Sequence, residues 1–191
     1  TIPDPERFGP GPFPTAVLIS GSGQQDRDET LLGHKPFLVI ADRLTQRGIA
    51  VMRYDDRGIG GSAVDDMTLV TQATSEHFAT DARMVMERLK SVEHVDPTRI
   101  GFVGHSEGGL IGPLVAQEHD DVAFLVLLAG PGVVGADLLE LQVRLMLEGS
   151  GVTGDALDRI MTLQRKIIDS VVEGATFDEL QALADQMLAV Q

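Results

Sequence analysis

The chain has 191 residues, of which 43% are hydrophobic, and it carries a formal net charge of −14. This length can form one domain that buries about 70% of its unfolded surface, and the hydrophobic content excludes wholesale disorder. The acidic balance excludes nucleic acid as a partner, because phosphate binding needs concentrated Lys and Arg, and the absence of cysteine excludes disulfides, thiolate catalysis and Cys-ligated metals.

The first two thirds of the chain alternate between strand and helix patterns. Residues 1–14 are rich in Pro and Gly and predict an extended loop. Apolar runs then predict strands at 16–19, 49–52, 100–104 and 122–129, and helical spacing predicts helices at 36–47, 75–90 and 108–118. The strands are continuous apolar runs, which is typical of a parallel sheet covered on both faces. The predicted fold class is therefore α/β, with Asp96-Pro97 expected to form a turn.

After Gly130-Pro131-Gly132 the pattern becomes entirely helical. Helices are predicted at 137–148, 155–172 and 177–190, and Thr176-x-x-Glu179 matches a capping box at the start of the last. We therefore predict an α/β core over residues 1–135 and a helical cap over residues 136–191.

Membrane and targeting signals are absent from the sequence pattern. No window reaches the 18 consecutive apolar residues of a membrane-spanning helix, and no membrane partner is expected. The chain begins with Thr1, which indicates a trimmed N-terminus or an excerpt of a longer protein. The compartment is not fixed: the cytoplasm is favoured, with export and a removed signal peptide as the alternative.

The motif that carries chemistry is Gly104-His105-Ser106-Glu107-Gly108, a match to G-x-S-x-G. It follows a predicted strand and opens a predicted helix, which is the context of a nucleophile elbow. Flanking glycines are expected because a Cβ there would collide with the neighbouring strand or helix. Ser106 is thus the candidate nucleophile and the Glu107 amide a candidate oxyanion donor. The alternative is a structural Gly-Ser turn.

A second glycine-rich segment, 20–23, follows the first predicted strand. Where a nucleophile elbow stands on such a sheet, a loop that follows another strand supplies the second oxyanion donor. We expect this donor to be the amide of Gly21 or Ser22. A plain strand-to-loop turn is the alternative, and a phosphate loop is a third, although no G-x-G-x-x-G is present.

Four segments together resemble one group of enzymes: residues 19–28 (ISGSGQQDRD), 33–36 (GHKP), 53–58 (RYDDRG) and 104–109 (GHSEGG). Over roughly residues 15–135 the chain resembles the α/β-hydrolase superfamily, within it the bacterial esterase-like group related to serine aminopeptidases and acyl-thioesterases. The resemblance implies a Ser-His-Asp/Glu triad, ester hydrolysis through an acyl-enzyme, no cofactor, and a helical cap inserted after the sixth sheet strand, where residue 137 onward stands.

The sequence departs from that group in its histidines. The triad order is Ser, acid, His, yet His119 is the only histidine after Ser106. It ends a predicted helix about 16 Å long that runs away from the serine, so it is beyond reach. We therefore expect the acid and the histidine of the triad to be absent from this chain, a partial copy of the fold. His34 and His105 are weak candidates for substrate contact, and no metal site is expected.

Asp55 and Asp56 form a carboxylate pair at the end of a predicted strand. We expect a structural role, with Arg53 or Arg57 as partner, over general acid–base catalysis. The predicted function is hydrolysis of a small-molecule carboxylic ester. The alternatives are an aminopeptidase, thioesterase or acyltransferase of the same fold, or an inactive fragment or non-catalytic binding module. A homo-oligomer or a complementing segment could complete the sheet.

Overall fold

The computed structural model describes residues 1–190 and contains one four-stranded sheet. All its pairings are parallel, and the strand order is β2-β1-β3-β4. The strands are β1 (Phe13–Ile19), β2 (Ala50–Met52), β3 (Val95–His105) and β4 (Leu125–Leu128). The chain divides into two compact units, Thr1–Gly130 and Pro131–Gln191, and the sheet lies wholly in the first.

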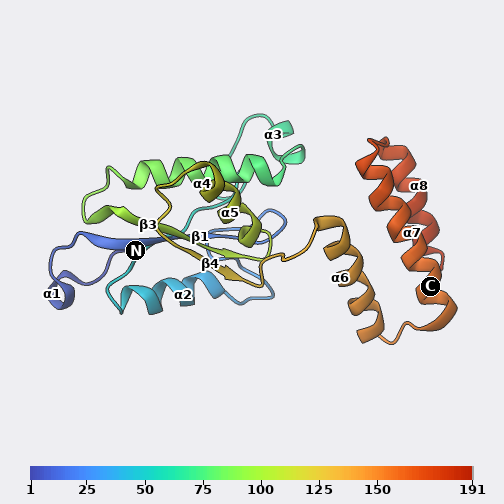
Figure 1. Cartoon of the computed structure of the whole chain (residues 1–191), viewed down its shortest axis with the longest axis horizontal. Helices are drawn as coiled ribbons and strands as arrows, with labels where there is room; N and C mark the ends of the chain where they lie inside the picture. The colour runs from blue at the N-terminus through green and yellow to red at the C-terminus, as the bar shows by residue number, and fades with distance from the viewer. Residues whose placement is uncertain (191) are drawn as a thin grey trace. The chain divides into compact units, whose positions relative to one another are not determined.

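Helices cover both faces of this sheet. Figure 1 shows α2 (Pro36–Thr45) on one face and α4 (Ser75–Leu89) on the opposite face. Helix α5 (Gly108–Glu118) packs beside α4 and against β3. The predicted α/β class, with a parallel sheet between helical layers, is confirmed.

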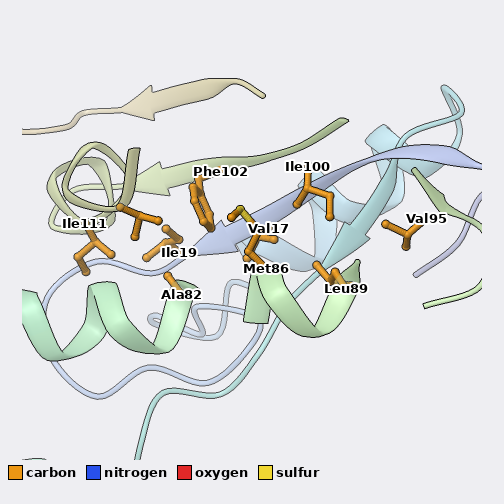
Figure 2. Packing of buried hydrophobic residues seen from close by; sticks show 10 residues of the cluster. Val17, Ile19, Ala82, Met86, Leu89, Val95, Ile100, Phe102 and Ile111 are labelled. Atoms are coloured by element: carbon orange, nitrogen blue, oxygen red, sulfur yellow. The ribbon is translucent and has the colours of Figure 1, made fainter. Parts of the chain in front are cut away.

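The core follows from the side-chain alternation of β1. Val17 and Ile19 point into a cluster that α4 and α5 complete, which Figure 2 shows around Phe102 and Met86. Ala16 and Leu18 point to the other face, where they pack with residues of α2. A strand buried on both faces must be apolar at every position, which explains the unbroken run 16–19.

The N-terminal segment contains more structure than predicted. The prolines there led us to expect only extended loop, but α1 (Pro5–Phe8) is a short helix with Pro5 in its first turn. Proline is tolerated at that position because the first-turn N–H has no helical acceptor to lose, and Asp4 caps the helix by accepting from the Glu6 amide. A second short helix, α3 (Thr68–Thr71), lies between β2 and α4.

Strand β3 begins earlier than predicted. The expected turn at Asp96-Pro97 lies inside its bounds, in an irregular stretch where Phe13 pairs with Val95 and Thr15 pairs with Ile100. Two steps along β1 therefore match five along β3, so the ladder is interrupted there. Asp96 accepts from the backbone N–H and the hydroxyl of Thr98, which gives the stretch its local bend.

Strand β4 corrects an expectation about burial. Its apolar run predicts a buried strand, yet Leu125, Val126 and Leu127 are 37%, 43% and 49% exposed. The reason is that, among the residues described, β4 pairs only with β3 and forms an edge of the sheet.

The second unit consists of three helices: α6 (Gly135–Gly149), α7 (Gly154–Val172) and α8 (Phe177–Leu188). The predicted capping box is confirmed, since the Thr176 hydroxyl accepts from the Glu179 amide and the Glu179 carboxylate accepts from the Thr176 amide. Over residues 1–190, none of the helices has the length and apolarity that crossing a bilayer requires.

Candidate active site

Ser106 occupies a sharp turn between β3 and α5. Its φ is +51°, a left-handed conformation that is unfavourable for a residue with a side chain. Two backbone bonds hold the turn: Ser106 N–H donates to the Leu128 carbonyl at 2.9 Å, and Gly109 N–H donates to the Ser106 carbonyl at 2.9 Å. Backbone strain of this kind occurs where the surrounding structure enforces it, as in a nucleophile elbow.

The flanking glycines are required by close backbone packing. A Cβ on Gly104 would lie 2.0 Å from the Gly108 carbonyl oxygen, and one on Gly108 would lie 2.2 Å from the Ile19 carbonyl oxygen. Both distances are far below van der Waals contact. The backbone at both glycines therefore packs too tightly for any side chain, as the sequence pattern predicts.

The amides of Gly21 and Ser22, the two candidate oxyanion donors in residues 20–23, differ in their hydrogen bonding. Gly21 N–H donates to the Glu29 carboxylate at 2.7 Å and is already used. Over residues 1–190, the amides of Ser22 and Glu107 have no hydrogen-bond acceptor. Glu107 stands at the N-terminal cap of α5, where the helix dipole favours negative charge. Of the three candidate oxyanion donors, the amides of Ser22 and Glu107 are thus free, and that of Gly21 is bonded to Glu29.

The side chain of Glu107 forms no ion pair within residues 1–190. Its carboxylate accepts from the Ser75 hydroxyl at 2.6 Å, at the first turn of α4. Arg57 forms a two-pronged ion pair with Asp81. The residue after the nucleophile is therefore tied to a neighbouring helix through its side chain while its amide stays free.

Asp55 pairs with a cation that sequence reasoning did not select. Its carboxylate receives two side-chain bonds from Arg27, at 3.0 and 2.6 Å, together with the Arg27 and Gly61 amides. The expected pairing of Asp55 with Arg53 or Arg57 is therefore wrong, because Arg27 lies within reach on the loop after β1. The bonds from the Arg27 side chain, with that from the Gly61 amide, hold the pKa of Asp55 well below its usual range.

Asp56 is bonded to the candidate oxyanion loop and, among residues 1–190, has no basic partner. It accepts from the Ser20 hydroxyl at 3.0 Å and from the Gln25 amide at 3.0 Å. Burial raises its pKa from the ordinary 3.8 to about 6, against those bonds, and the nearby carboxylates of Asp81 and Glu107 add to the rise. Asp56 therefore fastens both ends of residues 20–25, and its charge depends on pH.

This raised pKa predicts a pH-dependent stability. Between about pH 4 and pH 6 the folded protein holds a proton on Asp56 that the unfolded chain has released, so stability contributed by this group increases as pH falls. Relative to Asp56→Asn, the native protein should gain about 1–3 kcal/mol of unfolding free energy between about pH 7.5 and pH 4. Urea unfolding of both proteins at the two pH values measures this difference, and an unchanged difference would contradict the assignment.

The histidines have other partners. Within residues 1–190 none of them is hydrogen-bonded to Ser106, whose hydroxyl has no partner there. His34 is exposed and its backbone pairs with Leu31, so its expected substrate contact stays a prediction. Each of the other histidines has a partner of its own. His77 bonds to the Thr74 amide and His94 to the Pro10 carbonyl. His105 bonds to the Glu29 carboxylate, and His119 contacts the Arg83 guanidinium. No group of three or more His, Cys, Asp or Glu in that range could hold a metal ion.

Sequence reasoning missed Glu29, Ser75 and the Ser20–Asp56 bond, all of which lie around the elbow. Glu29 belongs to no motif in the sequence, since it lies between the matching segment 19–28 and a polar threonine. The buried position of its side chain emerges only from the loop fold.

A parallel sheet between helices, with a serine at a strained strand-to-helix turn beside two free amides, defines the class of α/β-hydrolases. The family model described as "Serine aminopeptidase, S33" matches residues 35–171, and the chain belongs to that family. Esterase EstD of Thermotoga maritima is 33% identical over 172 residues, which cover 87% of this chain and 40% of that protein. An uncharacterized protein of Mycobacterium tuberculosis is 27% identical over 94% of this chain and 57% of its own.

Solved structures agree on the fold. The 2,6-dihydroxy-pseudo-oxynicotine hydrolase aligns with a TM-score of 0.56 at 21% identity, over 85% of this chain and 41% of that one. The Pyrococcus furiosus esterase Pf2001 aligns with a TM-score of 0.52 at 16% identity, over 92% of this chain and 69% of that one. The chain thus has the α/β-hydrolase fold and an esterase-like family membership, and it spans roughly half the length, or less, of the curated relatives it matches.

Proposed function

We propose that Ser106 is the nucleophile of a carboxylic ester hydrolase that acts through an acyl-enzyme. The observation that carries the proposal is the left-handed Ser106 at the head of α5, held by backbone bonds and by glycines that admit no side chain. The esterase name of the Thermotoga maritima relative favours an oxygen ester as substrate.

In the proposed reaction, Ser106 Oγ forms a bond to the ester carbonyl carbon and gives its proton to a base. The carbonyl oxygen becomes an oxyanion, which the amides of Ser22 and Glu107 stabilise by hydrogen bonds. The bond to the alkoxy group then breaks and the alcohol leaves with that proton. Water hydrolyses the acyl-enzyme by the same steps in reverse order, releasing the acid and restoring Ser106.

We propose that the base and its orienting acid come from residues other than those described here. Two observations support this: His105 is bonded to Glu29, and His119 lies at the far end of α5 beside Arg83. We assign α6, α7 and α8 to the cap of the fold, because they follow β4 and contain no strand. The proposed mechanism uses no cofactor, metal or macromolecular partner.

A substrate panel tests this assignment against the alternatives of the same fold. The complete gene product that contains these residues would be assayed with p-nitrophenyl esters, an acyl thioester and an aminoacyl p-nitroanilide. We expect the oxygen ester to give the largest kcat/KM, with a burst of p-nitrophenol equal to the enzyme concentration when deacylation is slow. A preference for the anilide or thioester would identify an aminopeptidase or thioesterase. No turnover of any of them would favour a binding module.

A further inference from the structure

Glu29 is a buried acid in an unfavourable backbone conformation. Its side chain is 8% exposed, and its φ of +51° places a residue with a side chain in the left-handed region. Burying a carboxylate and straining its backbone are both costly, so the surrounding structure must compensate. The loop between β1 and α2 supplies part of that compensation, since Glu29 N–H donates to the Asp26 carbonyl at 2.9 Å.

The contacts of the Glu29 carboxylate lie beside Ser106. One oxygen, Oε1, accepts from the Gly21 amide at 2.7 Å and from Nδ1 of His105 at 2.7 Å. His105 directly precedes Ser106 in the elbow, and Gly21 belongs to the candidate oxyanion loop. A single carboxylate oxygen therefore joins the elbow to that loop.

The packing around Gly21 shows how closely the two segments approach. A Cβ on Gly21 would lie 3.2 Å from Ser106 Cβ, 3.3 Å from Glu29 Oε1 and 3.4 Å from His105 Nδ1. The bond to Glu29 thus anchors the Ser20–Gly21 peptide, and Gly21 itself lies close to Ser106. The Ser22 amide belongs to the next peptide along the chain, so anchoring Gly21 restricts the positions that the Ser22 amide can take.

We propose that Glu29 is a positioning residue for the oxyanion loop, with His105 as the group that holds its carboxylate in place. The inference rests on the proposed function of Ser106. It adds that Glu29, by anchoring Gly21, keeps the Ser22 amide oriented toward the oxyanion of the transition state. A hydrogen bond to a carboxylate is roughly twice as strong as a neutral one, and burial strengthens it further. Preorganised donors of this kind act in the transition state and contribute little to ground-state binding.

The test compares two substitutions of nearly equal length in the complete gene product. Glu29→Met removes the acceptor, and Glu29→Gln keeps a neutral one. We expect Glu29→Met to lower kcat by about 10- to 100-fold with KM changed by less than about threefold, since a misdirected oxyanion donor affects the transition state. Glu29→Gln should recover most of that loss. Affinity for an aryl trifluoromethyl ketone, whose adduct carries the oxyanion, should fall in parallel with kcat/KM.

Glu87→Met is the matched control. One oxygen of the Glu87 carboxylate accepts two hydrogen bonds, from Arg83 and from Lys90, on helix α4 and without contact to Gly21. The substitution is the same and removes the same number of hydrogen bonds as Glu29→Met, yet kcat should stay within about twofold of the native value.

Two further results separate failure of this inference from failure of the proposed function. If Glu29→Met keeps native kcat and native ketone affinity while Ser106→Ala is inactive, the positioning role is wrong and the nucleophile stands. If Ser106→Ala retains activity, the proposed function itself fails. Should Glu29→Met not fold, His105→Ala decides: we expect kcat to fall by about 3- to 10-fold with KM unchanged, and an unaltered kcat would overturn the role.

Discussion

Replacing Ser106 with Ala should abolish ester hydrolysis by the complete gene product, with kcat lowered by about 10⁴-fold or more. The reason is chemical: without Oγ no acyl-enzyme can form, and only the free amides remain to stabilise a direct attack by water. The elbow itself should survive, because its bonds come from the backbone N–H and carbonyl of Ser106 and from Gly109. KM and thermal stability should therefore change little. Initial rates with a p-nitrophenyl ester measure the effect.

Ser91→Ala controls for loss of a serine hydroxyl as such. Ser91 is exposed just after α4, and within the described residues 1–190 its hydroxyl bonds only to Arg88. This variant should retain the native rate. If Ser106→Ala were to keep more than about a tenth of native kcat, the nucleophile would have to be another group.

The second large effect concerns Gly104. Gly104→Ala should destabilise the protein by about 3–5 kcal/mol or prevent its folding, because the added methyl would lie 2.0 Å from one backbone oxygen and 2.7 Å from a backbone nitrogen. Neither atom belongs to a flexible side chain, so β3 and α5 would have to separate. Urea unfolding measures the stability, and ester hydrolysis should be lost with the elbow geometry.

Gly132→Ala is the control for this substitution. A Cβ there would meet no atom within 4 Å, and its φ lies outside the positive region. Its stability should match the native protein to within about 0.5 kcal/mol. A Gly104→Ala protein as stable as the Gly132→Ala control would show that the elbow is not packed as described.

Local signals were enough to predict much of this fold. The helix at 108–118 matches α5 at both ends, because the elbow glycines fix its start and its apolar face fixes its length. Strands β1, β2 and β3 follow from apolar runs typical of a sheet covered on both faces, whereas the apolar run of β4 lies on an exposed edge. Short elements such as α1 escaped prediction, since a proline in the first turn of a helix looks the same in sequence as a proline in a loop.

Long-range pairing of charges was the part that sequence could not provide. Arg53 and Arg57 each lie two positions from Asp55 along the chain, but Arg53 bonds to Asp28 and Arg57 to Asp81. Residues two apart on extended backbone point to the same side, which favours these pairings, but residues 53–58 follow the end of β2 at Met52 and are not part of the strand. The cation that pairs with Asp55 comes from Arg27, 28 positions away in the sequence. The Gly21 amide illustrates the same limit, because its acceptor Glu29 reaches it only through the folded loop.

Labelling the complete gene product with a fluorophosphonate probe, followed by tryptic peptide mapping, tests the central claim most directly. Cleavage after Arg99 and Arg144 releases a peptide in which Ser106 is the only hydroxyl-bearing residue. The account predicts one probe per chain on that peptide, with loss of ester hydrolysis in proportion to labelling. An active protein that stays unlabelled there, or that carries the probe on another peptide, would contradict Ser106 as the nucleophile.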